Sequence, residues 1–181
     1  MKIFKGIILL ALTFTTTLVA TEKTKKFTLK SFDGFEMETA IDMPDGFKNI
    51  DVKRVVIFLH GSGPQNMDED LTKISAPGVK NLFFVDVSKE FVKAGFAVVR
   101  YNKRSFEIGR KIRVNHEFIK SKFHKKFMKH PLQHFVKDAQ HYAKLAQKRF
   151  PKAKVYFLGH SQGANVALWA ANETSEVDGV V

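Results

Sequence analysis

The sequence Gly159-His160-Ser161-Gln162-Gly163 lies between a short apolar run, residues 155–158, and a helix-forming run, residues 164–172. This order predicts a strand, a tight turn and a helix, with Ser161 at the tip of the turn. The two glycines keep side chains out of the space where the strand and the helix approach each other. The free N–H groups at the start of the helix favour negative charge beside Ser161. The alternative is an inert serine in a glycine-rich turn.

Apolar runs and helical patterns alternate along the rest of the chain. Continuous apolar runs at 55–59 and 96–99 are typical of strands that are buried on both faces of a sheet. The other expected elements are strands at 27–29 and 35–41, helices at 86–94, 118–128 and 135–150, and the opening of a strand at 177–181. Strands that alternate with helices predict an α/β fold with a doubly wound, mostly parallel sheet.

The length of 181 residues suits a single domain, and 44% hydrophobic with 27% charged residues is an ordinary globular composition. The chain contains no cysteine. Disulfides, thiolate metal sites and cysteine nucleophiles are therefore excluded.

Residues 1–20 have the pattern of a secretory signal peptide. Lys2 and Lys5 give a positive start, residues 6–14 are nearly all apolar, and the segment ends in a small residue. It is too short for a comfortable membrane span. We therefore expect cleavage that leaves residues 21–181, with export to the periplasm or the medium; an uncleaved N-terminal membrane anchor is the alternative. No cysteine follows the apolar run, which excludes a lipid-anchored lipoprotein.

The positive charge is concentrated in one part of the chain. The formal net charge is +12, and residues 100–129 contain eleven basic residues and two acidic ones. Ile119, Phe123 and Phe127 recur every four residues, which predicts an amphipathic helix with lysines on its outer face. The segment Gly109–Lys129 could bind an anionic membrane surface or an acidic polymer, whereas the simpler interpretation is a solvated face. No nucleic-acid-binding signature accompanies it, so we expect no nucleic acid partner.

Three strings occur in a specific order along the chain. The first buried strand runs into H-G-S-G-P at 60–64, followed by acidic residues at 68–70, and the next strand ends in R-Y-N-K-R at 100–104. The string K-D-A at 137–139 then precedes G-H-S-Q-G. In these strings the chain resembles bacterial esterase-like and serine-aminopeptidase-like members of the α/β-hydrolase superfamily, from about Phe27 to its last residue.

The resemblance implies an α/β-hydrolase fold and assigns roles. Ser161 would be the nucleophile of a nucleophile elbow, and the backbone N–H groups of Gln162 and of Ser62, or of Gly63, would form an oxyanion hole. The supporting positions around this site are His60, Gly61, Gly63, Gly159 and Gly163. Supporting polar contacts are expected from Lys103, Arg104 and Asp138. His60 is expected to be structural and not the general base.

The chain also departs from the family. Asn102 stands where the family string R-Y-D-K-R has Asp, and the basic residues at about 105–131 form an insertion that resembles a lid. The superfamily places its acid and then its histidine after the nucleophile, but no histidine follows Ser161 in this sequence. We therefore expect an N-terminal portion of a longer hydrolase domain, without its last strands, acid loop and histidine loop. A short protein that has lost catalysis is the alternative.

All seven histidines precede Ser161, and His160 is expected to point away from it. The spacing of His134, Asp138 and His141 places them on one helical face, which could hold a transition metal. No fourth ligand accompanies them, so a solvated polar face is the preferred interpretation. We predict neither a metal nor an organic cofactor.

The predicted function is acyl transfer from an ester, or less favourably an amide, to Ser161. The substrate would be a small molecule. The alternative is an exported binding protein that uses the basic segment Gly109–Lys129, with weak contact to an anionic membrane surface. The two hypotheses differ in whether Ser161 reacts with a fluorophosphonate.

Overall fold

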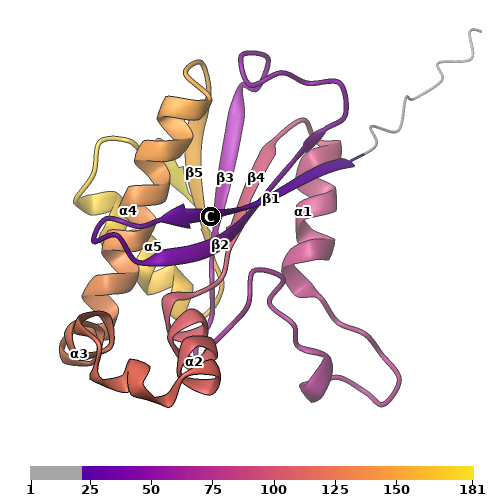
Figure 1. The fold of residues 1–181 in the computed structure, drawn as a ribbon. Helices are drawn as coiled ribbons and strands as arrows, with labels where there is room; N and C mark the ends of the chain where they lie inside the picture. Colours follow the sequence, from indigo (N-terminus) through magenta and orange to yellow (C-terminus); the bar gives the residue numbers. More distant parts are fainter. Residues whose placement is uncertain (1–21) are drawn as a thin grey trace, which may run out of the picture.

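Residues 22–181, which the computed structural model describes, form a six-stranded sheet flanked by helices (Figure 1). The strand order is β1-β2-β4-β3-β5-β6. The strands are β1 (Glu22–Lys30), β2 (Glu36–Pro44), β3 (Arg54–Leu59), β4 (Ala97–Tyr101), β5 (Lys154–Gly159) and β6 (Gly179–Val180). The signal peptide predicted at residues 1–20 lies outside the described residues.

The centre of the sheet is parallel and its N-terminal edge is antiparallel. β3 pairs in parallel with β4 on one side and with β5 on the other, whereas β1 and β2 form an antiparallel hairpin joined to β4. All residues of β3 after Arg54 are buried, as expected for a strand covered on both faces. The α/β fold with a mostly parallel sheet is therefore confirmed, and β6 confirms the strand predicted to open near Val177.

Helices cover both faces of the sheet. The α-helices are α1 (Phe83–Lys93), α2 (Arg104–Val114), α3 (Lys122–Lys129), α4 (Pro131–Arg149) and α5 (Gln162–Asn172), and the 3₁₀ helices are η1 (Thr72–Ile74) and η2 (His116–Lys120). Figure 1 shows α1 on one side of the sheet and α4 with α5 on the other. Phe84 of α1 packs against Val56 and Val98, while Ala139 and Ala143 of α4 join the opposite core.

In the basic part of the chain one helix prediction was wrong and one helix was missed. The single helix expected at 118–128 is divided into η2 and α3, because Ser121 has an extended backbone and its side chain caps α3 by accepting the N–H of His124. The helix α2 was not predicted at all. Its buried residues include Arg104 and Glu107, so its inner face carries charge and shows no clear apolar period.

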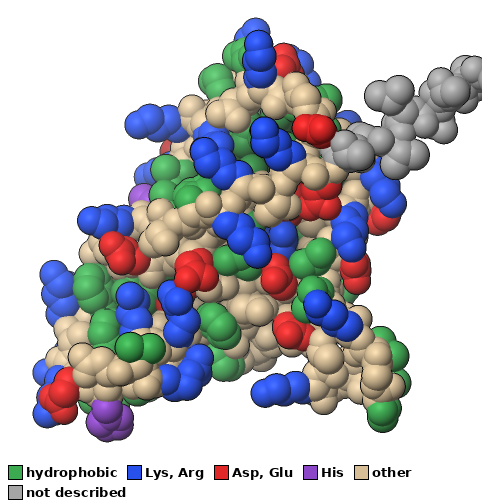
Figure 2. All heavy atoms as spheres, turned by 45° about the vertical axis from the view of Figure 1, so that its right-hand side comes forward, with side chains coloured by type: hydrophobic (Ala, Val, Ile, Leu, Met, Phe, Trp, Pro, Cys, Tyr) green, Lys and Arg blue, Asp and Glu red, His purple; other side chains and the backbone are tan. Residues whose placement is uncertain are grey.

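The phenylalanines of the segment Gly109–Lys129 face the protein. Phe118 and Phe123 pack against Phe35 of the N-terminal hairpin, with ring centroids 6.5 and 5.4 Å apart, and Phe127 packs against Phe135 of α4 at 5.5 Å. The aromatic side chains that a membrane-binding helix would insert into lipid thus pack against the protein, whereas Ile119 and Met128 are exposed. Figure 2 shows basic side chains mixed with acidic and apolar ones on the face it displays.

None of the helices within residues 22–181 combines the length and the apolar composition that crossing a bilayer requires. The loop between β3 and α1, which contains η1, projects from the body of the molecule (Figures 1 and 2). In Figure 1 this loop, α2 and α3 all lie at the end of the sheet where β3 and β4 finish. The candidate site is built at that end.

Candidate active site

The turn between β5 and α5 holds Ser161 in a strained backbone conformation. Its φ of 53° and ψ of −116° lie in a region that residues with a side chain rarely adopt. A Cβ on Gly163 would lie 2.0 Å from the carbonyl oxygen of Leu59, and one on Gly159 would lie 2.6 Å from the backbone of Ala164. The close approach of β3, β5 and α5 therefore requires both glycines, as the sequence predicted, and leaves Ser161 exposed at the tip.

Two backbone N–H groups flank this tip without a partner. Within residues 22–181, neither the N–H of Ser62 nor that of Gln162 donates a hydrogen bond to the protein. Ser62 is exposed in the loop that follows β3, and Gln162 is the first residue of α5. Unpaired donors at a helix start suit an anion or a developing oxyanion. The resemblance assigned these two donors, with Gly63 as the alternative to Ser62; the N–H of Gly63 is likewise without a partner among the described residues.

Backbone contacts join the loop after β3 to the elbow. The N–H of His160 donates to the carbonyl oxygen of Leu59 at 3.0 Å, and Gly159 pairs with Leu59 in the register of the two parallel strands. The absent side chain of Gly163 allows the start of α5 to lie directly on the same carbonyl. The two segments that carry the free N–H groups are therefore positioned against each other by the main chain.

Glu69 forms a second link between the same segments. Its Oε1 accepts the N–H of Gly61 at 2.9 Å and lies 2.9 Å from Nδ1 of His160. The residue is fully buried, has a φ of 45°, and its Oε2 has no partner among the described residues. A buried carboxylate in a strained backbone position is costly. In return, its carboxylate links Gly61 in the loop after β3 to His160 in the elbow.

Lys103 forms a third link from the opposite side. Its Nζ donates to the carbonyl oxygen of Gly61 at 2.6 Å and to Oε1 of Gln162 at 2.7 Å, and it lies 4.5 Å from the centre of the Phe135 ring. Burial lowers the pKa of Lys103 to about 8, against the opposing effect of the Glu69 charge. Glu69 therefore holds the N–H of Gly61, and Lys103 holds its carbonyl oxygen.

His60 and His160 are both engaged in packing. The ring of His60 is buried between Phe84 and Tyr101, at centroid distances of 5.1 and 5.5 Å, and burial, helped by the charge of Lys103, lowers its pKa to about 3. Within the described chain its Nε2 has no hydrogen-bond partner. The ring of His160 lies on Phe83 at 5.1 Å and is directed toward the Glu69 carboxylate. His60 is therefore a neutral buried imidazole.

The end of β4 is fixed by buried ion pairs. Arg104 donates from Nε to Asp138 at 2.8 Å and from both terminal nitrogens to Asp33 at 3.0 Å, and Ser31 also donates to Asp138. Arg104 and Asp138 are 0% and 1% exposed, so this contact is internal. Burial raises the pKa of Asp138 even though the Arg104 charge opposes the shift. These residues make the supporting contacts that the resemblance predicted.

Arg100, within β4, forms a similar buried ion pair. Arg100 donates to Asp42 at 2.6 and 3.1 Å and also to Asp68, and Ser88 donates to the same Asp42 at 2.6 Å. Burial alone would raise the pKa of Asp42, but the hydrogen bonds and charge of Arg100 hold it below its usual value. Because Asp68 belongs to the loop after β3, this pair also ties that loop to β4.

Asn102 has a specific set of partners that explains its amide. Its Oδ1 accepts the N–H of Met67 at 2.7 Å, while its Nδ2 donates to Glu107 at 2.7 Å and to Glu38 at 3.3 Å. An aspartate here would place a carboxylate against two others. The departure from the family string R-Y-D-K-R is thus matched by Glu107 of α2.

The three residues considered as metal ligands point to different partners. Asp138 is committed to Arg104, Nδ1 of His134 lies 2.9 Å from the carbonyl oxygen of His130, and Nε2 of His141 lies 2.9 Å from that of Lys30. The expected solvated polar face was wrong for Asp138, which is buried. Among residues 22–181 no group of three or more His, Cys, Asp or Glu side chains is arranged to hold a metal ion.

Sequence reasoning missed the contacts that Glu69 and Lys103 make across the site. Both residues lie within strings that carried the resemblance, but a string gives no indication of which side chain crosses to which loop. The acidic residues at 68–70 were a signal that the loop after β3 carries a carboxylate beside the candidate site. The positive φ of Glu69 gave no signal, because Glu is not a residue type expected there.

Known proteins are similar to this chain in both sequence and fold. The sequence pattern of the serine aminopeptidase S33 family matches residues 81–181. Esterase EstD of Thermotoga maritima is 31% identical over 126 residues, which cover 70% of this chain and 25% of that protein. The chain thus spans about a quarter of the length of that curated relative.

Solved structures of two enzymes share the fold. A brefeldin A esterase, described as a bacterial homologue of human hormone sensitive lipase, superposes with a TM-score of 0.58 at 18% identity, covering 97% of this chain and 42% of its own. A post-proline cleaving enzyme from Rickettsia typhi superposes with a TM-score of 0.60 at 17% identity, covering 88% of this chain and 20% of its own. At these identities the likeness concerns the fold.

Proposed function

The chain belongs to the serine aminopeptidase S33 family of α/β-hydrolases, and from this premise we propose that Ser161 is the nucleophile of an acyl-transfer reaction on a small-molecule ester. The observation that carries the proposal is the backbone of Ser161, which has a φ of 53°. Ser161 lies between Gly159 and Gly163, and a side chain at either glycine would clash with the backbone. Strain at a functional residue is maintained only where the surrounding structure holds it.

The proposed reaction has two halves. The Oγ of Ser161 attacks the ester carbonyl carbon while its proton passes to a general base. The carbonyl oxygen becomes an oxyanion that accepts hydrogen bonds from the N–H groups of Ser62 and Gln162. Collapse of the intermediate expels the alcohol, which takes the proton from the base. Water then attacks the acyl-enzyme by the same route and releases the carboxylic acid, restoring Ser161.

Lys103 and Glu69 act in this proposal as positioning residues. They hold the carbonyl oxygen and the N–H of Gly61, the residue before Ser62, while Lys103 also binds the side chain of Gln162. A shift of either segment by about 1 Å would misplace an oxyanion donor, at a cost of about a hundredfold in rate. Their removal should lower kcat with a smaller effect on KM.

The two histidines that adjoin the elbow, His60 and His160, are not placed to act as the general base. Burial lowers the pKa of His60 to about 3, and His160 is directed toward Glu69. We propose that the general base and the acid come from outside the printed residues. The intact mass of the protein as its native cell produces it tests this, since a product of the mass of residues 21–181 would contradict it.

An ester is preferred to an amide because two of the similar proteins are named as esterases. The amide alternative rests on the aminopeptidase family pattern and on the post-proline cleaving enzyme. Turnover of p-nitrophenyl acetate and butyrate against a matched p-nitroanilide, by the protein purified from its native cell, distinguishes them. Faster ester turnover that disappears in Ser161→Ala supports the proposal; turnover that survives the substitution overturns it.

The basic insertion at about 105–131 is proposed to border the substrate site. Ser105, at the start of α2, donates to the carbonyl oxygen of Gly63 at 3.4 Å, so the segment begins beside the oxyanion loop. We also propose that the protein is exported, on the pattern of residues 1–20. Amino-terminal sequencing of protein from the periplasm or the medium tests this, and an intact Met1 in the cytoplasm would contradict it.

A further inference from the structure

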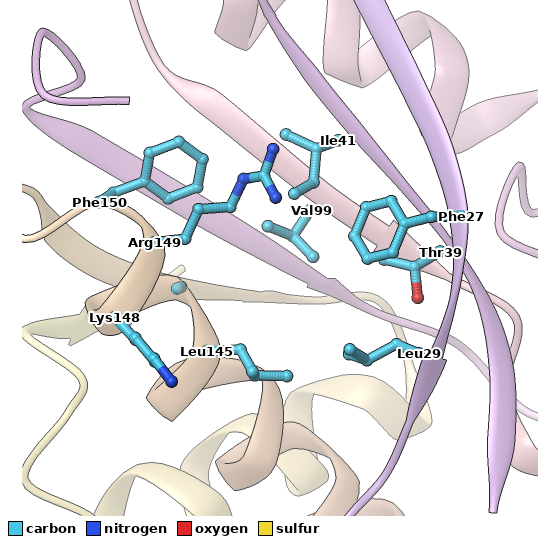
Figure 3. Close-up of a pocket in the computed structure, with 10 residues that line it drawn as sticks. Phe27, Leu29, Thr39, Ile41, Val99, Leu145, Lys148, Arg149 and Phe150 are labelled. Atoms are coloured by element: carbon cyan, nitrogen blue, oxygen red, sulfur yellow. The ribbon is translucent and has the colours of Figure 1, made fainter. Parts of the chain in front are cut away.

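A hollow lies at the other end of the sheet from Ser161. It has a volume of about 350 Å³ and is lined by side chains of β1, β2, β4 and the last turns of α4 (Figure 3). The lining residues are Phe27, Leu29, Thr39, Ile41, Val99, Leu145, Ala146, Lys148, Arg149 and Phe150. β5 begins a few residues after Arg149 and carries the elbow at its far end, roughly 20 Å along the strand. The hollow is therefore separate from the candidate active site.

The lining is apolar except for a basic end. None of the ten lining residues is acidic, and the two charged ones, Lys148 and Arg149, are both cations. The hydroxyl of Thr39 is already engaged with Tyr142 at 2.7 Å. A ligand that fits these walls therefore combines an aliphatic body with an anionic group.

Arg149 is the unusual member of the lining. Figure 3 shows its side chain extending from α4 into the hollow toward Ile41 and Val99. Its guanidinium carbon lies 5.9 Å from the Phe27 ring centre and 5.8 Å from that of Phe150. Its Nε is shielded from solvent and has no hydrogen-bond partner within residues 22–181, where no carboxylate pairs with this side chain. A buried donor without a partner is costly unless a ligand satisfies it.

We propose that this hollow binds a medium-chain alkanoate, with its carboxylate on Arg149 and its chain along Phe27, Leu29 and Val99. A guanidinium matches a carboxylate in charge and in planar geometry. At about 30 Å³ for each group of water size, the volume holds roughly twelve non-hydrogen atoms, which is the size of decanoate. The site does not depend on Ser161 or on the proposed acyl transfer.

Titration with sodium decanoate, followed by calorimetry and by the methyl resonances of the protein, tests the proposal. Decanoate should shift the methyl signals of Leu29, Ile41 and Val99 and leave those of Val166, in the elbow helix, unchanged. Shortening the chain to octanoate should weaken binding roughly tenfold, as expected for two methylene groups. Decanol, which lacks the charge, should bind at least about tenfold more weakly than decanoate.

Matched variants separate the guanidinium from general positive charge. Arg149→Gln should weaken decanoate binding by about tenfold to a hundredfold, whereas Lys144→Gln, which removes the same charge from an exposed residue of α4 outside the lining, should change it little. Leu145→Trp, which fills the hollow from the surface of α4, should abolish binding without unfolding the protein. Ser161→Ala should bind decanoate like the original chain.

The proposal is overturned if decanoate does not bind at millimolar concentration, if decanol and decanoate bind equally, or if Arg149→Gln and Lys144→Gln lose binding equally. Shifts confined to the elbow residues would place the alkanoate at the active site as a reaction product and would equally refute the second site.

Discussion

Basic residues at the start of the 100–129 run are buried, whereas those at its end are exposed. Arg100, Lys103 and Arg104 are 3%, 5% and 0% exposed and each contacts a carboxylate or a peptide carbonyl, but Lys125 and Lys126 of α3 lie on the surface. Basic residues thus form internal polar contacts at the carboxyl end of the sheet in one case, and they lie in solvent on the outer face of a helix in the other. Position relative to the sheet decides what a basic residue does, and composition alone does not show it.

The largest effect that separates the two groups is expected from Arg104→Met. The substitution leaves the buried carboxylate of Asp138 without its cation and should lower the free energy of unfolding by about 3–5 kcal/mol. Lys125→Met on exposed α3 is the matched control and should change it by less than about 0.5 kcal/mol. Urea denaturation measures both, and equal midpoints for the two variants would contradict the contrast.

Glycine substitutions test a corresponding contrast, between the tightly packed backbone at the elbow and the open surface of α2. Gly163→Ala places a Cβ 2.0 Å from the Leu59 carbonyl oxygen and should cost at least about 3 kcal/mol. Gly109→Ala, in α2, meets only Arg113 at 3.7 Å and should stabilise the protein by about 0.5–1 kcal/mol, because alanine is the better helix former. Thermal unfolding of both variants checks the opposite signs, and a tolerated alanine at 163 would contradict the close packing at the elbow.

Asn102→Asp tests whether the polar contacts at the end of β4 depend on the amide group of Asn102. The new carboxylate would face Glu107 and Glu38 and should cost about 2–3 kcal/mol at neutral pH, with a smaller loss in acid, where a protonated carboxyl can donate. Adding Glu107→Gln should recover most of the stability. Urea midpoints of the single and double variants measure the coupling, and additive losses would show that these residues do not interact.

The smallest expected effect is that of His60, and it is seen only in how the free energy of unfolding depends on pH. Its pKa is about 3 in the fold and 6.5 in the reference state, so the unfolded chain binds the extra proton between these values. Stability should therefore fall as pH decreases below 6.5, by about 2 kcal/mol at pH 5 from this residue alone. In His60→Phe that part of the slope should be missing, and an unchanged slope in urea unfolding at several pH values would contradict the assignment.

The elements around Ser161 were predictable because their signals are local. An apolar run, two glycines and a helix-forming run specify the elbow within residues 155–172, and buried strands such as β3 read as continuous apolar runs. The helix α2 was not predictable in the same way. Its buried face carries Arg104, which pairs with Asp138, and Glu107, which accepts the backbone N–H of Glu38; both partners lie far away in the chain.

The same distinction between local and long-range signals applies to the candidate site. The position of Ser161 and the free N–H groups beside it follow from sequence order, but the contacts of Lys103 and Glu69 with Gly61 depend on how three segments meet. A single chain contains no information on such pairing beyond the presence of the charged residues. The lysine and the carboxylate were visible in the sequence, and their link across the oxyanion loop was not.

Covalent labelling with a fluorophosphonate is the most direct measurement, carried out on the protein purified from its native cell. An acyl-transfer site at the elbow predicts one adduct, mapped by peptide mass spectrometry to the peptide that contains Ser161 and absent in Ser161→Ala. Lys103→Met should slow labelling while Lys125→Met should not. A folded protein that forms no adduct, or one that is labelled at another residue, would contradict the assignment of Ser161 as the nucleophile.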